Sequence, residues 1–425
     1  MPKTLPSTHT AKIKLKGIVA NPNIAPHIKE SVLAYETAGL LKYFYTSFIC
    51  HKNDPLSKIL FVILPIFIHE FKRRAFEEID YKFVRTKPYT ELLRVFAARN
   101  LSSIITDKIW EKSELSFDKW VARNLTEDLN FIHVVEHTCL STIKKAKTLN
   151  IKSFYEQPSI HHKTFSETVK RQLKIYPDFD IESIKLLYNE ASIRRNKRRD
   201  EELKLADYII CNSSYTKKTL VDGGVNESKI ISIPLGFPDV KIRTTNTKQY
   251  ERLIFLTAGN LSIGKGTHIL IEAWKEINIS GANAELWLVG KNNLPESFTH
   301  TIPKNIKLFG NIPRTELMIK FAEANVLIHP TLADGFGMVI TEAMSCGLPV
   351  ITTYNSIGPD IIEDKKSGLL IESNNKAAIK DSINWCINNK EKLSLIGIEA
   401  LKKAKSYPWS EYRKNLVTEI YNRLL

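Results

Sequence analysis

The sequence has few cysteines and no close pair of them. An odd, dispersed set of this kind favours reduced thiols and a cytoplasmic setting. The adjacent histidines His161 and His162 could suggest a metal site, but no third ligand stands at a suitable spacing, so we expect no metal. The 425-residue chain carries its five cysteines without any Cys-x-x-Cys spacing, at Cys50, Cys139, Cys211, Cys346 and Cys386.

Long apolar runs and a secretory leader are also missing. The run Ile59–Ile68 has ten residues and contains Pro65, which makes it too short to span a bilayer. The amino-terminal stretch 1–17 lacks the apolar core of a signal peptide. We therefore expect no membrane span, and we predict a short disordered lead at the amino terminus.

Positive charge is in excess. The formal net charge is +15, and residues 1–240 hold +10 of it, which leaves +5 for residues 241–425. A basic surface implies an anionic partner: nucleic acid, a membrane or an acidic substrate. No nucleic-acid recognition module and no interleaving of basic and aromatic residues is present, so we expect no nucleic-acid partner. An anionic membrane surface fits better.

Two basic segments each allow two interpretations. Residues 57–74 join the short apolar run to Lys72, Arg73 and Arg74, and amphipathic stretches follow at 81–84, 92–98 and 104–110. They predict either a contact with the membrane interface or a buried helical insert. The run Arg194–Arg199 is either a solvated helix face, within a helix predicted over 181–206, or a contact with phosphate or lipid headgroups.

The stretch Asn325–Thr353 is the most informative. It predicts a buried strand at Val326–His329, a glycine loop, a helix at 338–345 and a second strand at 348–352, as in a parallel α/β sheet. The helix is apolar almost all the way round, so its Glu342 needs a partner. Asp334 stands in the loop at the helix mouth, where anions are favoured. In one interpretation, both carboxylates line a cleft at the carboxyl end of the sheet. In the other, Glu342 points outward through a gap and Asp334 is only a loop and cap residue.

A second loop suits phosphate. A strand at Leu253–Ala258 leads through 259–266, which is rich in glycine and contains Lys265, into a helix predicted over 267–277. Backbone N–H groups can approach a diphosphate closely there, and the ammonium of Lys265 can neutralise it. The spacing is not that of a P-loop.

These motifs resemble the GT-B retaining glycosyltransferases of family 4 (glycosyl transferases group 1). The resemblance is carried by Asp334 and Glu342 with seven residues between them, then Ala343-Met344 and Gly347-x-Pro349-Val350, and by Lys265. Three positions differ from the usual pattern. Asp334 replaces a glutamate, Asn260 replaces an arginine, and the loop 21–25 replaces a Gly-Gly loop.

The resemblance implies an α/β fold of two Rossmann-like domains with parallel sheets facing across a cleft. We expect an amino-terminal acceptor-side domain over 1–237, a donor domain over 238–405, and a helix over 406–425 that packs back on the first domain. The reaction implied is transfer of a sugar, with retention, from a nucleotide-diphosphate sugar to a glycan or lipid-linked acceptor. No cofactor or metal is implied.

The resemblance and the strand ends together give the candidate residues. Catalytic roles are expected for Asp334, Glu342 and Lys265. Donor contacts are expected from Asn260, Gly264, Gly266, Gly310, Asn311, Gly335, Phe336, Gly337 and Met338. Strands predicted at 131–135 and 152–157 end at the cleft, so acceptor or cleft contacts are expected from Asn21, Glu136, His137, Gln157 and His161. A noncatalytic GT-B binding subunit and a nucleotide-sugar epimerase remain the alternatives. The expected location is the cytoplasm, with a peripheral position on the inner face of the membrane as a further option.

Overall fold

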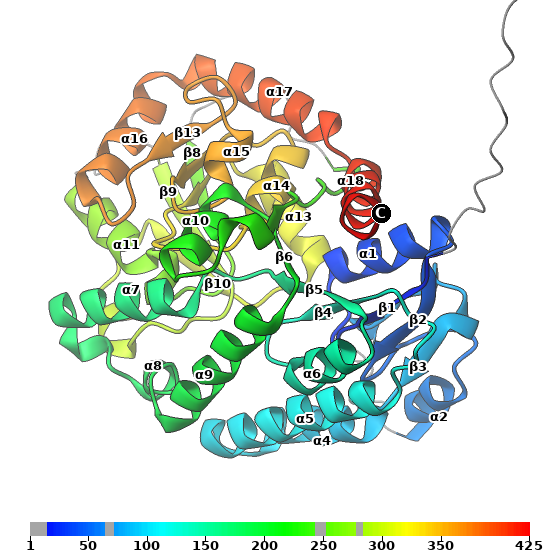
Figure 1. Ribbon diagram of the computed structural model, residues 1–425. Helices are drawn as coiled ribbons and strands as arrows, with labels where there is room; N and C mark the ends of the chain where they lie inside the picture. The colour runs from blue at the N-terminus through cyan, green and yellow to red at the C-terminus, as the bar shows by residue number, and fades with distance from the viewer. Residues whose placement is uncertain (1–14, 64–71, 243–251, 278–283) are drawn as a thin grey trace, which may run out of the picture.

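Two parallel β-sheets, each covered by helices, form the molecule (Figure 1). The computed structural model describes residues 15–63, 72–242, 252–277 and 284–425, with the side chains of 60–63 left out. The first sheet has the order β3-β2-β1-β4-β5-β6-β7 and the second has the order β10-β9-β8-β11-β12-β13. Every pair of neighbouring strands in both sheets is parallel.

The first sheet belongs to the amino-terminal half. Its strands are β1 (Gly17–Ala20), β2 (Leu41–Thr46), β3 (Val84–Thr86), β4 (Phe131–Val135), β5 (Lys152–Gln157), β6 (Tyr208–Cys211) and β7 (Ile230–Ser232). The helices of this half are α1 (Pro26–Thr37), α2 (Pro55–Ile63), α4 (Pro88–Asn100), α5 (Ser103–Arg123), α6 (Leu140–Thr148), α7 (His162–Ile175), α8 (Glu182–Lys185), α9 (Glu190–Leu205) and α10 (Ser214–Asp222).

The second sheet belongs to the carboxyl-terminal half. Its strands are β8 (Leu253–Ala258), β9 (Ala284–Val289), β10 (Ile306–Gly310), β11 (Val326–His329), β12 (Val350–Thr353) and β13 (Leu369–Ile371). Its helical segments are η5 (Ile263–Lys265), α11 (Thr267–Glu276), α12 (Glu296–Thr299), α13 (Arg314–Glu323), α14 (Met338–Ser345), α15 (Gly358–Ile361), α16 (Lys376–Asn388) and α17 (Lys390–Ser406), followed by α18 (Trp409–Leu424).

The central strands have the bounds that their apolar runs predict. All five residues of β4 and all six of β9 are buried, because helices cover both faces of a parallel sheet. The helix predicted over 181–206 is wrong as one element. It breaks between α8 and α9, where the side chain of Asn189 accepts a hydrogen bond from the backbone N–H of Ser192 and caps a new helix.

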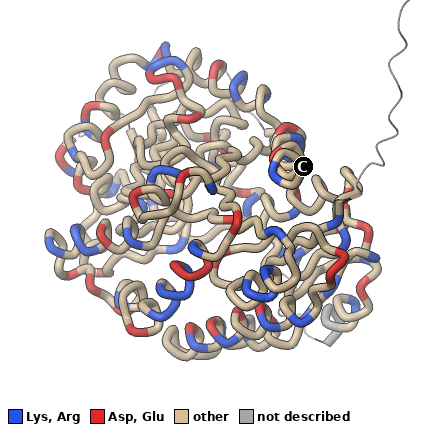
Figure 2. The backbone as a smooth tube through the Cα atoms, viewed as in Figure 1, with Lys and Arg blue, Asp and Glu red and all other residues tan. Residues whose placement is uncertain are grey.

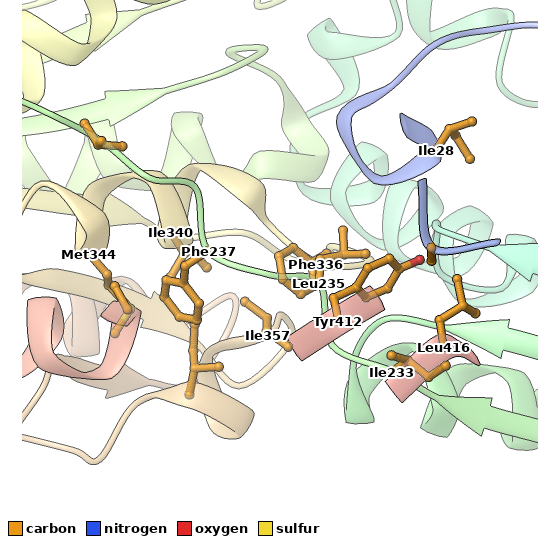
Figure 3. Packing of buried hydrophobic residues seen from close by; sticks show 14 of the residues in the cluster. Ile28, Ile233, Leu235, Phe237, Phe336, Ile340, Met344, Ile357, Tyr412 and Leu416 are labelled. Carbon is orange, nitrogen blue, oxygen red and sulfur yellow. The ribbon is translucent and has the colours of Figure 1, made fainter. Parts of the chain in front are cut away.

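One hydrophobic core runs through both halves. It includes Leu235 and Phe237 of the linker after β7, Phe336 of the loop after β11, and Tyr412 of α18, and Figure 3 shows these residues within the cluster. Helix α18 lies beside α1 in Figure 1, and the hydroxyls of Ser31 and Tyr412 are hydrogen-bonded at 2.9 Å. The last helix therefore ties the carboxyl-terminal half to the first domain.

Helix α7 is a second tie between the halves. Its Gln172 donates from Nε2 to Asn374 Oδ1 at 2.8 Å, and the hydroxyl of Tyr176, next to the helix, donates to Glu272 of α11 at 2.9 Å. Within the described ranges, no helix is both long enough and apolar enough to cross a bilayer. Half of the apolar run Ile59–Ile68, residues 64–68, lies outside the described residues.

Candidate functional site

Asp334 and Lys265 meet at the carboxyl end of the second sheet. Asp334 follows β11 and Lys265 ends η5, and their side chains form an ion pair. His329, the last residue of β11, donates from Nε2 to Asp334 Oδ2 at 3.0 Å. Burial alone raises the pKa of Asp334, but the ammonium of Lys265 and the hydrogen bond from His329 outweigh it and hold that pKa well below its ordinary value. Asp334 is therefore a carboxylate at neutral pH.

Glycine allows the two loops to come this close. Gly266 has φ +68°, and a Cβ there would lie 2.0 Å from the carbonyl oxygen of Pro330. Gly337, with φ +87°, is the residue before α14. The carbonyl of Gly264 accepts from the backbone N–H of Leu332 at 3.0 Å, which fixes the phosphate-type loop against the acidic loop. The expected glycines thus shape the backbone at the site.

Glu342 has an unexpected partner. It lies on α14, and its Oε1 is 2.9 Å from an Nη of Arg314 on α13. Burial raises the pKa of Glu342, and the guanidinium of Arg314 partly offsets that rise. Arg314 was missed by the sequence reasoning, since the two residues are on different helices and no local spacing links them.

The loop around Gly335 touches the amino-terminal domain directly. Its carbonyl accepts from the hydroxyl of Ser213 at 2.6 Å and from that of Thr216 at 2.8 Å, at the start of α10. A Cβ on Gly335 would lie 2.0 Å from the carbonyl oxygen of Pro158, which follows β5. The carboxyl ends of the two sheets therefore face each other and make contact here.

Two cavities lie between the halves. One, of about 710 Å³, is lined by the loop 23–25 and by residues of α4 and α5 on one side, and by Lys291 and Asn311 on the other. A second, of about 620 Å³, is lined by Ile24, Arg314 and Met338 among others. Asn311 and Met338 thus face open space between the halves, and Asn260 and Gly310 are exposed. Phe336 is different, because its side chain is buried in the core, so only its backbone could contact a ligand.

Most of the acceptor-side candidates are in a buried polar network. Glu136 is paired with Arg199, and Gln157 donates from Nε2 to Glu136 Oε2 at 3.0 Å. Burial raises the pKa of Glu136, but Arg199, His137 and the hydrogen bond from Ser159 together outweigh it, and the pKa is lowered overall. Asn21 accepts from the backbone N–H of Asn23 at 2.9 Å. These contacts support the loops at the strand ends, and they do not by themselves indicate a ligand.

The two histidines acquire a third neighbour. His162 Nε2 is 2.6 Å from Asp200 Oδ1, and His161 Nε2 is 3.8 Å from the same atom. These three residues could in principle surround a metal ion. However, Nδ1 of His161 accepts from the backbone N–H of Lys163 at 3.2 Å, which leaves the ring proton on Nε2, where a metal would need the lone pair.

His137 has φ +75° and a pKa that burial lowers to about 4, so it is neutral.

The basic run 194–199 is paired along much of its length. Arg194, Arg195 and Arg198 of α9 contact carboxylates of α5: Glu111 at 3.3 Å, Asp107 at 2.6 Å and Glu114 at 3.1 Å, respectively. Figure 2 shows the Lys and Arg segments interspersed with Asp and Glu segments along the helices at the bottom of the view. Three arginines of the run therefore join two helices.

Two parallel-sheet domains that meet through the loops at the carboxyl ends of their strands, with an ion-paired site on the second, define a GT-B protein. Residues 240–403 match the family model "Glycosyl transferases group 1". Residues 240–403 of the carboxyl-terminal half are accordingly similar to the glycosyl transferases group 1 family.

Individual proteins agree with this assignment. The chain is 30% identical over 210 residues to an uncharacterized glycosyltransferase of Methanocaldococcus jannaschii, covering 48% of this chain and 57% of that protein. It is 27% identical over 237 residues to the capsular polysaccharide biosynthesis glycosyltransferase CapM of Staphylococcus aureus, and the match covers 52% of this chain and 62% of that protein. The chain thus spans less than two thirds of the length of these relatives. The structure of Anabaena HepE in complex with UDP and glucose superimposes with a TM-score of 0.61 at 15% identity, covering 96% of this chain and 100% of that one.

Proposed function

We propose that the protein is a retaining glycosyltransferase that moves a sugar from a nucleotide-diphosphate sugar to an acceptor hydroxyl, in the synthesis of a polysaccharide or glycolipid. The ion pair of Lys265 and Asp334 at the junction of the two domains carries this proposal. CapM, by its name, serves capsular polysaccharide biosynthesis, and HepE binds UDP and glucose. Both support the reaction class.

In the proposed reaction the bond between the anomeric carbon and the diphosphate oxygen breaks, and a bond from that carbon to the acceptor oxygen forms. The leaving diphosphate receives the acceptor proton. Lys265 stabilises the negative charge that grows on the diphosphate, and backbone N–H groups near Gly266 and Gly337 assist it. Asp334 holds sugar hydroxyls. The proposal includes no metal and no cofactor.

Glu342 accepts hydrogen bonds from the ribose hydroxyls of the donor. Arg314 favours the charged form of this carboxylate and partly offsets the rise in its pKa that burial causes, so we add Arg314 as a positioning residue. It also lines the second cavity with Met338. Asn311 lines the first cavity, next to the turn at which we propose that the nucleobase binds.

Calorimetry with a panel of nucleoside diphosphates, together with slow hydrolysis of the corresponding nucleotide sugars, tests the donor site. We expect one nucleoside diphosphate to bind and Lys265→Ala to weaken that binding. Lys275→Ala is the matched control, since Lys275 is an exposed lysine of the same domain at the end of α11. Binding of no nucleoside diphosphate would favour a noncatalytic subunit, and isomerisation of a donor without acceptor would indicate an epimerase.

We also propose that the protein works at an anionic membrane surface on the cytoplasmic side. The helices α4 and α5 expose large apolar side chains to solvent, including Tyr89 (81% exposed), Leu93 (53%) and Phe96 (51%). These three positions share one face of α4, since they are four and three residues apart. Leu101, Ile104 and Ile105 extend the exposed set onto the start of α5. We call these six residues the apolar face of the α4–α5 hairpin.

An apolar face bordered by cations suits the headgroup zone of an anionic bilayer. Arg99 and Lys108 are exposed beside it. Flotation with phosphatidylglycerol vesicles tests this: Leu93→Ser with Phe96→Ser should release the protein. Leu395→Ser, at an exposed apolar position on α17, should not. Equal flotation of all three proteins would reject the membrane contact.

A further inference from the structure

The larger cavity between the domains is strongly basic. Its lining includes four arginines, Arg73, Arg74, Arg94 and Arg99, and Lys291 from the opposite domain. The residues that line it include no aspartate or glutamate. A concave site with positive charge on both walls concentrates anions.

Two of these arginines are held in place. Glu91, which is 3% exposed, is paired with both Arg74 and Arg94, and Arg94 donates to it from Nε at 2.8 Å and from an Nη at 2.6 Å. The guanidinium of Arg94 also stacks over Trp110, 4.3 Å from the ring centroid. One carboxylate and one aromatic ring thus fix the orientation of the guanidinium groups, so a bound anion would find them already positioned.

The cavity is next to the apolar face of the α4–α5 hairpin. Arg94, Val95, Ala98 and Arg99 of α4 line the cavity, while Leu93 and Phe96 of the same helix are half exposed to solvent. A molecule that places an anionic group in the cavity can therefore lay an apolar chain along the helix. Phosphate suits a site with several arginines, because their planar forks match its oxygens.

We propose that this cavity binds the phosphate of the acceptor, and that the acceptor is a phosphorylated lipid whose chain lies on the apolar face of the α4–α5 hairpin. The inference rests on the proposed function, since it names the acceptor of that reaction. The four arginines belong to the amino-terminal, acceptor-side domain, whereas Lys265 and Glu342 belong to the donor domain. The lipid phosphate and the donor diphosphate thus occupy different walls of the same gap.

Calorimetry with three probes tests the chemistry of the ligand. Farnesyl phosphate carries a phosphate and an apolar chain, inorganic phosphate lacks the chain, and farnesol lacks the phosphate. Each is titrated into the full-length protein with excess UDP present, so that the donor site is filled. We expect farnesyl phosphate to bind more tightly than either partial probe. Equal binding of inorganic phosphate and farnesyl phosphate would overturn the lipid assignment.

Variants then locate the site. Arg73→Gln with Arg99→Gln should weaken farnesyl phosphate binding about 25-fold, from about fivefold for each arginine near an anionic headgroup. Arg194→Gln, an exposed arginine of α9 that does not line the cavity, should change it less than about twofold. Equal losses in both proteins would mean a general charge effect and would overturn the site.

The donor site is checked in the same samples. If the arginine variants lose affinity for UDP and keep affinity for farnesyl phosphate, the cavity holds the donor phosphates and the proposal fails. If the wild-type protein binds neither UDP nor another nucleoside diphosphate, the proposed donor site fails, and the farnesyl phosphate titrations still decide whether the cavity takes a lipid phosphate.

Discussion

Replacing Asp334 by asparagine tests the central ion pair, because it removes the charge and keeps the shape. The side chain of Asp334 is 15% exposed and that of Lys265 is 32% exposed. Breaking a fully buried pair by removing one partner costs roughly 3–5 kcal/mol. Since about a third of the Lys265 side chain still contacts solvent, we expect a loss of about 2–3 kcal/mol in the free energy of unfolding.

A double-mutant cycle isolates the pair from other effects of the substitution. Urea denaturation of Asp334→Asn, Lys265→Met and the double variant gives the three free energies. Each single variant leaves one charge without its partner, so the double variant should lose less stability than the sum of the two singles, by about 2 kcal/mol. Transfer should fall about 100-fold in Asp334→Asn. Additive losses in stability would refute the pairing.

The pH dependence provides an independent check. The pKa of Asp334 is held below its ordinary value, so its contribution is present above the unfolded pKa of about 3.9 and is lost as the pH falls through the folded pKa. The stability difference between the wild-type protein and Asp334→Asn should therefore be constant between about pH 8 and pH 5 and should narrow only below about pH 4. A difference that stays constant as the pH falls below about 4 would mean that the pKa of Asp334 is not depressed.

Three further outcomes follow from the site. Glu342→Ala should lower transfer about 100-fold with an unchanged circular dichroism spectrum, and unaltered turnover would remove Glu342 from the site. Arg314→Gln should raise the pKa of Glu342 further. As the pH is lowered, this variant should therefore lose donor affinity at a higher pH than the wild-type protein does, whereas Arg314→Lys should keep the wild-type dependence of donor affinity on pH. Gly335→Ala places a Cβ 2.0 Å from the carbonyl oxygen of Pro158, so X-ray scattering should show a larger radius of gyration. Gly264→Ala, whose Cβ would meet Phe165 at an ordinary 3.5 Å, should not change it.

The strands and the two site loops could be predicted because their signals are local. β8 and β9 are continuous apolar runs ended by glycine loops, and burial on both faces leaves little freedom in where such a strand begins and ends. Asp334, Glu342 and Lys265 are found by spacing within single loops and helices. The ion pair between two of them then follows from the meeting of β8 and β11 as neighbours in the sheet.

The remaining partners could not be predicted, because they come from distant elements. Arg314 reaches Glu342 from another helix, and Asp200 reaches His162 across 38 positions. His329 carried one usable signal: it is a polar residue at the carboxyl end of a buried strand, where a parallel sheet places its ligand-binding side chains. The basic run 194–199 gave no signal of its partners, which lie on α5 about 84 positions earlier.

The contact between the domains and the ion pair of the acidic loop depend on different groups of that loop. Ser213 and Thr216 donate to the backbone carbonyl of Gly335, and Pro158 approaches the same glycine closely. These contacts use the backbone of the loop, and Phe336 adds its side chain to the shared core. Among the described residues, the side chain of Asp334 makes its hydrogen bonds within its own domain, with Lys265 and His329. Under the proposed function, a change of side chain at position 334 can therefore alter which sugar hydroxyls are held without altering how the domains meet. This is why an aspartate in place of the family's usual glutamate is compatible with the fold, and why its effect should be sought in donor preference.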